Sequence, residues 1–156
     1  MAGNIIDLTV GNTEVVAKKI KEMTGGTLYK IAPIKAYSSD YRICAEESRA
    51  ELNANSRPEL TEKLKQIDDF DTIILCYPNW LGTMPMPVWT FLEQFDLTGK
   101  VVLPVCTHEG SKMGKSEADI KKLCPGSTIG KGLAIVGSTV NNANTVIQLW
   151  LENSIY

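Results

Sequence analysis

Three short segments of the chain carry groups suited to a small anionic ligand with a planar ring. The first is Thr9-Val-Gly-Asn-Thr13, directly ahead of a helical pattern. The first backbone N–H groups of a helix have no intrahelical partner, and the helix dipole favours an anion there. Gly11 lets the backbone approach closely, and the hydroxyls of Thr13 and Thr9 are candidate phosphate donors. The alternative for these residues is an ordinary turn in which Thr13 or Asn12 caps the helix.

The second segment is Tyr77-Pro-Asn-Trp-Leu-Gly-Thr-Met-Pro-Met-Pro87, which follows the most apolar run of the chain. Loops in solvent are usually rich in Ser, Asp and Asn instead. Large apolar groups on a stiff loop would form a wall for a flat aromatic ligand. The alternative is that Trp80, Leu81 and Met84 pack on a neighbouring helix or on another subunit. The candidate ligand contacts are Pro78, Asn79, Trp80, Leu81, Gly82 and Thr83.

The third segment, Thr107-His-Glu-Gly-Ser111, offers backbone amides, two hydroxyls, a carboxylate and the only histidine of the chain. His108 suggests catalysis, and the alternative is a loop histidine bonded to backbone. A nucleophile pair of Cys106 and His108 is possible in principle, since both residues lie near the mouth of the site, but it is disfavoured. The candidate ligand contacts are Thr107, His108, Glu109, Gly110 and Ser111.

Two apolar runs must position the second and third segments. Residues 71–77 and 100–107 are continuously apolar rather than alternating, which predicts parallel strands covered on both faces. Pro104 interrupts the second run and must lie at a bulge or where its missing N–H is tolerated.

The rest of the chain alternates between helical and strand patterns. Helices are predicted over 13–23, 39–53 with a Ser39-Asp40 cap, 87–95, 111–123 and 142–152, and further strands over 4–8, 27–31 and 132–136. This alternation predicts an α/β fold with a parallel sheet and helices on both faces. Ligands of such folds lie beyond the carboxyl ends of the strands, so the three segments should meet at one edge. Together they suit a mononucleotide with an aromatic ring system.

Composition and charge argue against several classes of partner and binding site. The 156 residues are 44% hydrophobic and 22% charged, which predicts one globular domain over residues 1–156. A net charge of −2 without a basic cluster argues against nucleic acid as a partner. No apolar run approaches the ~20 residues of a membrane span, and the N-terminus lacks the pattern of a secretion signal. Four cysteines without a CxxC pair argue against a zinc site and for reduced thiols in a cytoplasmic protein.

The three segments resemble the flavodoxin-like family, and most closely its small bacterial FMN-binding flavodoxins. The matching stretches are Gly11-Asn-Thr13, residues 77–86, residues 106–111 and residues 37–60 with Asp40-Tyr41. The resemblance implies a three-layer sandwich around a five-stranded parallel sheet of order 2-1-3-4-5. It implies FMN at the switch point, with the phosphate at Gly11, Asn12 and Thr13 and the ring between residues 78–82 and 107–111. It also implies that the flavin carries the redox chemistry, so no catalytic side chain is expected.

This sequence departs from the family pattern at three places. Leu81 stands where an aromatic is usual, so Trp80 is the alternative stacking partner. Glu109 stands where glycine is common, and its carboxylate would lower the flavin potential or hinder the ring. Family members begin with a long apolar strand and a serine-containing phosphate loop, whereas residues 4–10 look like an insertion that follows that strand. The first strand is therefore expected to be short or missing: either Ile5–Leu8 forms a shortened strand or a second chain fills the gap.

These features predict an FMN-binding electron-transfer protein that works with a redox partner protein. One alternative is an NAD(P)H-dependent quinone or flavin reductase on the same scaffold. Another is a truncated homologue that binds FMN weakly or not at all and serves as an interaction module. A homodimer is a further expectation.

Overall fold

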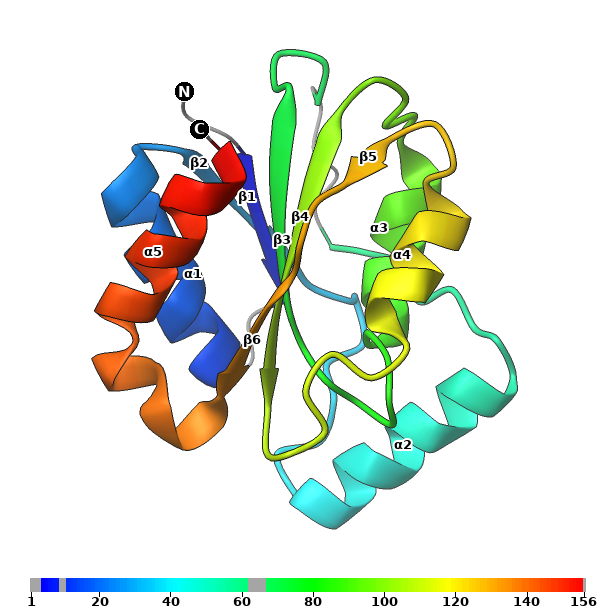
Figure 1. The fold of residues 1–156 in the computed structure, drawn as a ribbon. Helices are drawn as coiled ribbons and strands as arrows, with labels where there is room; N and C mark the ends of the chain where they lie inside the picture. Colours follow the sequence, from blue (N-terminus) through cyan, green and yellow to red (C-terminus); the bar gives the residue numbers. More distant parts are fainter. Residues whose placement is uncertain (1–3, 9–10, 62–66, 156) are drawn as a thin grey trace.

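The fold is built on one parallel sheet. The computed structural model describes residues 4–8, 11–61 and 67–155 (Figure 1). The strands follow the order β2-β1-β3-β4-β5, and β6 also pairs with β4. This confirms the predicted order 2-1-3-4-5, with the fifth position divided between two short strands. The strands are β1 (Asn4–Leu8), β2 (Thr27–Ile31), β3 (Thr72–Pro78), β4 (Val101–His108), β5 (Thr128–Ile129) and β6 (Leu133–Val136).

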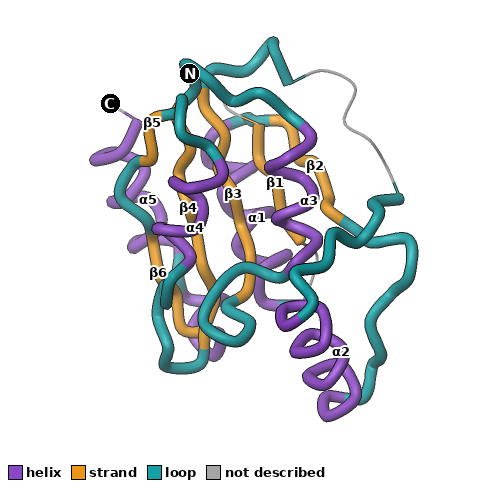
Figure 2. Tube along the Cα trace, turned by 90° about the vertical axis from the view of Figure 1, so that its right-hand side faces the viewer, coloured by secondary structure: helices purple, strands orange, loops and turns teal. Residues whose placement is uncertain are grey.

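Helices cover both faces of this sheet, as the alternation of patterns predicts. In Figure 1, α1 and α5 lie on one side of the strands, and α3 and α4 lie on the other. Figure 2 shows α2 extending from the body at one end of the sheet. The helices are α1 (Asn12–Thr24), α2 (Tyr41–Asn53), α3 (Met86–Gln94), α4 (Ser116–Leu123) and α5 (Asn144–Ile155), with the 3₁₀ helix η1 (Gly137–Asn142) ahead of α5.

The two apolar runs of the sequence form the middle of the core. Ile74 and Leu103 belong to the cluster with α1 and α5, whereas Ile73 and Leu75 pack in the cluster with α3 and α4. Successive residues of a strand point to opposite faces, so a strand covered on both faces is apolar at every position. These contacts confirm that β3 and β4 are buried on both sides.

The first strand is short but present. All five residues of β1 pair in parallel with β2, and Asn4–Asp7 also pair with β3. Of the two expectations for the start of the chain, the structure therefore shows the shortened strand, which lies inside the sheet between β2 and β3.

Pro104 of β4 lies opposite an interruption in the fifth position of the sheet, between β5 and β6. The Val101 N–H donates to Asp71 O on the β3 side, while Val102 O accepts from Gly130 on the other side. Because N–H groups alternate between the two sides along a strand, position 104 faces the β5–β6 side. There β4 pairs with β5 at Val101–Val102 and with β6 from Val105 onward, so the missing N–H falls between the two ladders.

Helix ends follow the predicted signals at most places. Asp40 caps α2, and its side chain accepts from the backbone N–H groups of Arg42 and Ile43 at 2.9 and 3.1 Å. Gly25 ends α1 with a φ of 71°, as the Gly25-Gly26 pair predicts. The helix predicted from residue 111 begins only at Ser116. The delay has a tertiary cause, because the turn before α4 packs Gly114, with a φ of 54°, directly against the loop after β3.

Candidate functional site

A cavity of about 530 Å³ opens where the carboxyl ends of the strands meet the N-terminus of α1. Small-molecule sites commonly have volumes of ~300–1,000 Å³. All three segments that the sequence singles out contribute to it, so the structure brings Trp80 and His108 to the same site. Its lining residues are Gly11, Asn12, Tyr41, Pro78, Asn79, Trp80, Thr107, His108, Glu109, Ser111 and Gly137.

The N-terminus of α1 forms the first wall. Gly11 precedes the helix with a φ of 41°, and no described side chain caps this end by a hydrogen bond. The first N–H groups of α1 are therefore left for another acceptor. Glu14, in the first turn, pairs with Lys18 at 3.1 Å on the exposed side of the helix. Thr9, the other predicted residue of this loop, lies outside the described residues.

Thr13 connects the first and third segments from beneath the cavity. Its buried hydroxyl lies 2.8 Å from the Thr107 hydroxyl. Each hydroxyl carries one proton, so one donates within the pair and the other keeps a proton for a further acceptor. The structure thus gives Thr13 a role in joining α1 to β4, while Thr107 lines the cavity.

The loop after β3 makes a tight turn that carries the aromatic wall. Trp80 and Thr83 exchange backbone hydrogen bonds of 2.9 and 3.3 Å. The two residues between them, Leu81 and Gly82, have φ values of 58° and 89°, as the central residues of a type I′ turn require. The Leu81 side chain is 41% exposed and lies outside this cavity.

Asn79 clamps the second segment to the third. Its backbone N–H donates to Thr107 O at 2.8 Å, and its side-chain amide donates to Lys112 O at 2.8 Å. Its amide oxygen accepts from the Gly82 N–H at 3.0 Å. Lys115 N–H then donates to Gly82 O at 2.7 Å. Two loops that follow different strands are therefore held together as one rigid wall.

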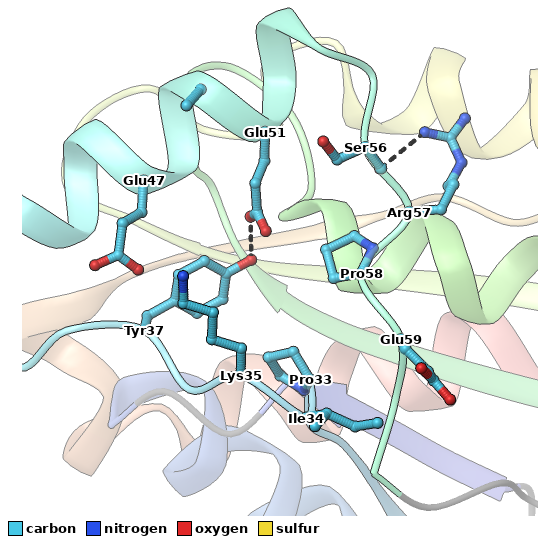
Figure 3. Close-up of a pocket in the computed structure, with 11 residues that line it drawn as sticks. Pro33, Ile34, Lys35, Tyr37, Glu47, Glu51, Ser56, Arg57, Pro58 and Glu59 are labelled. Atoms are coloured by element: carbon cyan, nitrogen blue, oxygen red, sulfur yellow. Dashed lines mark hydrogen bonds between the residues drawn. The ribbon is translucent and has the colours of Figure 1, made fainter.

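Tyr37 supports Trp80 from behind the cavity. The two rings meet edge to face, with centroids 5.0 Å apart and planes at 83°. Figure 3 shows the Tyr37 hydroxyl directed at Glu51 of α2, to which it donates a hydrogen bond. Burial, followed by this bond and the charge of Glu51, raises the pKa of Tyr37, so the phenol stays protonated. Sequence reasoning missed this support, because Tyr37 and Trp80 share no local pattern.

His108 is the last residue of β4 rather than part of the loop, and it is bonded to backbone as the alternative to catalysis predicts. Its Nδ1 accepts from the Gly110 N–H at 2.8 Å, and the side chain is 8% exposed. A neutral imidazole whose Nδ1 accepts carries its proton on Nε2. Cys106 is fully buried in the cluster with α3 and α4, and burial raises the pKa of its thiol to about 12. The thiol is therefore protonated at neutral pH, which agrees with the argument against a nucleophile pair.

Some predicted residues lie behind the site rather than along it. Thr83 is buried and donates to the Asp119 carboxylate at 2.5 Å, and the backbone N–H of Gly110 is used by His108. Met84 is 1% exposed and packs in the core, as the structural alternative for this loop predicts. Among the predicted contacts that the structure describes, the residues not found on the 530 Å³ cavity are Thr13, Leu81, Gly82, Thr83 and Gly110.

Two residues that line the cavity were not among the contacts predicted from the sequence. Gly137 follows β6, and Tyr41 opens α2 with its side chain 89% exposed. The Asp40 cap, which fixes the start of α2, was the available signal for Tyr41. Tyr41, Asn79 and Trp80 also line an adjoining cavity of about 480 Å³, together with Ser38, Ser39, Cys44, Ala45, Ser48 and Leu81.

Among the residues that the structure describes, no group of three or more His, Cys, Asp or Glu side chains is placed to hold a metal ion. Within the same part of the chain, no helix has the length and apolar character needed to cross a membrane.

Comparisons with known proteins agree with this architecture. The family model for flavodoxin matches residues 7–154. The chain is similar to a protein from Bacteroides uniformis assigned as a flavoprotein, with 30% identity and a TM-score of 0.81 over 95% of this chain and 99% of that one. A Bacteroides eggerthii protein with the same assignment shares 29% identity, with a TM-score of 0.78 over 94% and 98% of the two chains.

A more distant structure shares the fold. A Lactobacillus acidophilus flavoprotein, solved in complex with FMN, is 19% identical, with a TM-score of 0.75 over 90% of this chain and 97% of that one. The comparison with curated proteins gives no match.

Proposed function

The chain belongs to the flavodoxin family, and from that premise we propose that it binds FMN and transfers electrons to or from a redox partner protein. The observation that carries the proposal is that the uncapped N-terminus of α1 and the indole of Trp80 line one cavity of about 530 Å³. An anion site and an aromatic wall on the same cavity match the two ends of a flavin mononucleotide.

The residues at the α1 end fit a phosphate. Gly11 and Asn12 bring unpaired backbone N–H groups to the cavity, where the helix dipole favours an anion. The Thr13–Thr107 pair keeps one hydroxyl proton that neither partner accepts. We infer that these groups, with Thr9, hold the phosphate and orient the ribityl chain.

The residues at the other end fit a flat ring. Pro78, Trp80 and His108 line the cavity there, and the bonds of Asn79 fix the spacing between the two loops. Bound FMN would supply the electron chemistry, while the chain positions the ring and limits its access to water. Tyr41 lines the same cavity and is exposed, so a partner protein would reach this part of the site from solvent.

A flavin titration tests the proposal. We expect added FMN to bind with one site per chain and to lose fluorescence, because a ring beside Trp80 is quenched by the indole. Trp80→Leu should weaken this quenching, whereas Trp150→Phe should leave it unchanged, since Trp150 belongs to α5, is buried in the cluster with α1 and donates to Lys131 O at 2.8 Å. Unaltered FMN fluorescence and absorbance at saturating protein would overturn the assignment.

The adjoining cavity favours a second candidate, a flavin-dependent reductase. It shares Tyr41, Asn79 and Trp80 with the first cavity, has a volume of about 480 Å³ and is also lined by Leu81. This space would accommodate a nicotinamide or a quinone next to the ring. Steady-state oxidation of NADPH in the presence of a quinone separates the two candidates, because an electron carrier would turn over very slowly.

A further inference from the structure

The carboxylate of Glu109 lies close to the N-terminus of α1. A Cβ placed on Gly137 would overlap Oε1 of Glu109 and lie 2.5 Å from Nδ2 of Asn12. The Glu109 carboxylate and the Asn12 amide therefore converge over Gly137, and Asn12 is the first residue of α1. The side chain of Glu109 thus reaches across from the third segment to the helix N-terminus.

No cation of the described cavity lining offsets this charge. The lining residues include Glu109 as their one carboxylate and contain neither lysine nor arginine. The positive end of the α1 dipole, about half an elementary charge, attracts a carboxylate at this position. Glu14 does not take this position, because it pairs with Lys18 along the helix.

We propose that Glu109 is a specificity residue, whose carboxylate competes with the flavin phosphate for the N-terminus of α1. The inference rests on the proposed function. A phosphate carries about −1.5 to −2 charges at neutral pH, so its binding requires the carboxylate to withdraw or to accept repulsion. Riboflavin lacks the phosphate and escapes this competition. The chain should therefore discriminate less between FMN and riboflavin than the same chain without the carboxylate.

Paired titrations of the whole protein test the inference. In low-salt buffer, Glu109→Gln should raise the affinity for FMN about tenfold, as expected for removing one charge from beside a phosphate. The affinity for riboflavin should change less than about twofold. The gain for FMN should shrink as ionic strength rises, because Glu109 is exposed and its charge is screened.

Glu14→Gln is the matched control, because it removes the same charge from the exposed side of the first turn of α1, where Glu14 pairs with Lys18, and should therefore raise the FMN affinity much less than Glu109→Gln. Equal shifts for both flavins in Glu109→Gln, no shift for FMN, or the same gain in Glu14→Gln would each overturn the inference.

Inorganic phosphate separates this inference from the proposed function. Without flavin, phosphate should raise the melting temperature of Glu109→Gln at lower concentrations than it does for the wild-type chain. If this difference appears but no variant binds flavin, the competition stands and the flavin assignment fails. If flavin binds but neither phosphate nor FMN distinguishes the variants, the competition is refuted and the flavin assignment stands.

Discussion

Replacing Gly114 by alanine should break the joint between the two loops that form the cavity wall. Gly114 has a φ of 54°, in the region that costs an ordinary residue ~1–2 kcal/mol. A Cβ there would overlap Gly82 O and approach Gly82 C to 2.8 Å and Asn79 Nδ2 to 3.1 Å. The loops must separate, which weakens the Lys115–Gly82 bond and the Asn79–Lys112 bond, each worth ~0.5–1.5 kcal/mol. The total loss is about 2–5 kcal/mol.

Gly99→Ala provides the matched control. Gly99 also has a positive φ, 82°, but a Cβ there meets nothing within 4 Å. Its variant therefore carries the backbone cost alone. Urea denaturation should show Gly114→Ala less stable than Gly99→Ala by about 1–3 kcal/mol, and in a domain of this size ~2–4 °C of melting temperature accompanies each kcal/mol. Gly114→Ala should also weaken FMN binding, which Gly99→Ala should not. Equal stability losses, or unchanged FMN affinity in a folded Gly114→Ala, would refute the reasoning.

Three other predictions concern buried groups around the cavity. Thr13→Val should lower the free energy of unfolding by ~1–3 kcal/mol, because it leaves the buried Thr107 hydroxyl without its partner. The Thr13→Val/Thr107→Val double variant should lose less stability than the two single variants together. Additive losses in urea denaturation would contradict this coupling. The pKa of the Cys106 thiol is raised to about 12, so the thiol stays protonated at pH 8. A thiol reagent at pH 8 should therefore modify Cys106 only after unfolding. Rapid labelling of Cys106 in the native protein would contradict its burial. Tyr37→Phe keeps the ring but removes the hydrogen bond to Glu51. FMN should then bind several-fold more weakly, and Trp80 should quench its fluorescence less. Binding and quenching like those of the wild type would show that Tyr37 does not position the indole.

The sequence predicts the sheet well because burial on both faces leaves a strong signal. Residues 71–77 and 100–107 are apolar at nearly every position, and they become β3 and β4 with shifts of one residue at their ends. The meeting of the three segments follows from topology, since the carboxyl ends of parallel strands share one edge. Local capping chemistry, such as that of Asp40, fixes the start of α2.

The remaining features depend on contacts between distant segments. β5 has only two residues, too few to show the alternating pattern of a strand. The division of the fifth strand position between β5 and β6, and its relation to Pro104, therefore become visible only in the folded structure. The late start of α4 follows from the contact of Gly114 with Gly82. The position of the Glu109 carboxylate over Gly137 likewise depends on a residue from another loop, which no local pattern in the sequence indicates.

A crystal structure of the protein grown with FMN would test the central claim most directly. We expect the phosphate at the N-terminus of α1, against Gly11 and Asn12, and the flavin ring beside Trp80 between the loops that follow β3 and β4. Flavin bound instead in the cavity between Pro33 and Glu59 (Figure 3), or crystals without flavin after growth at saturating FMN, would contradict it.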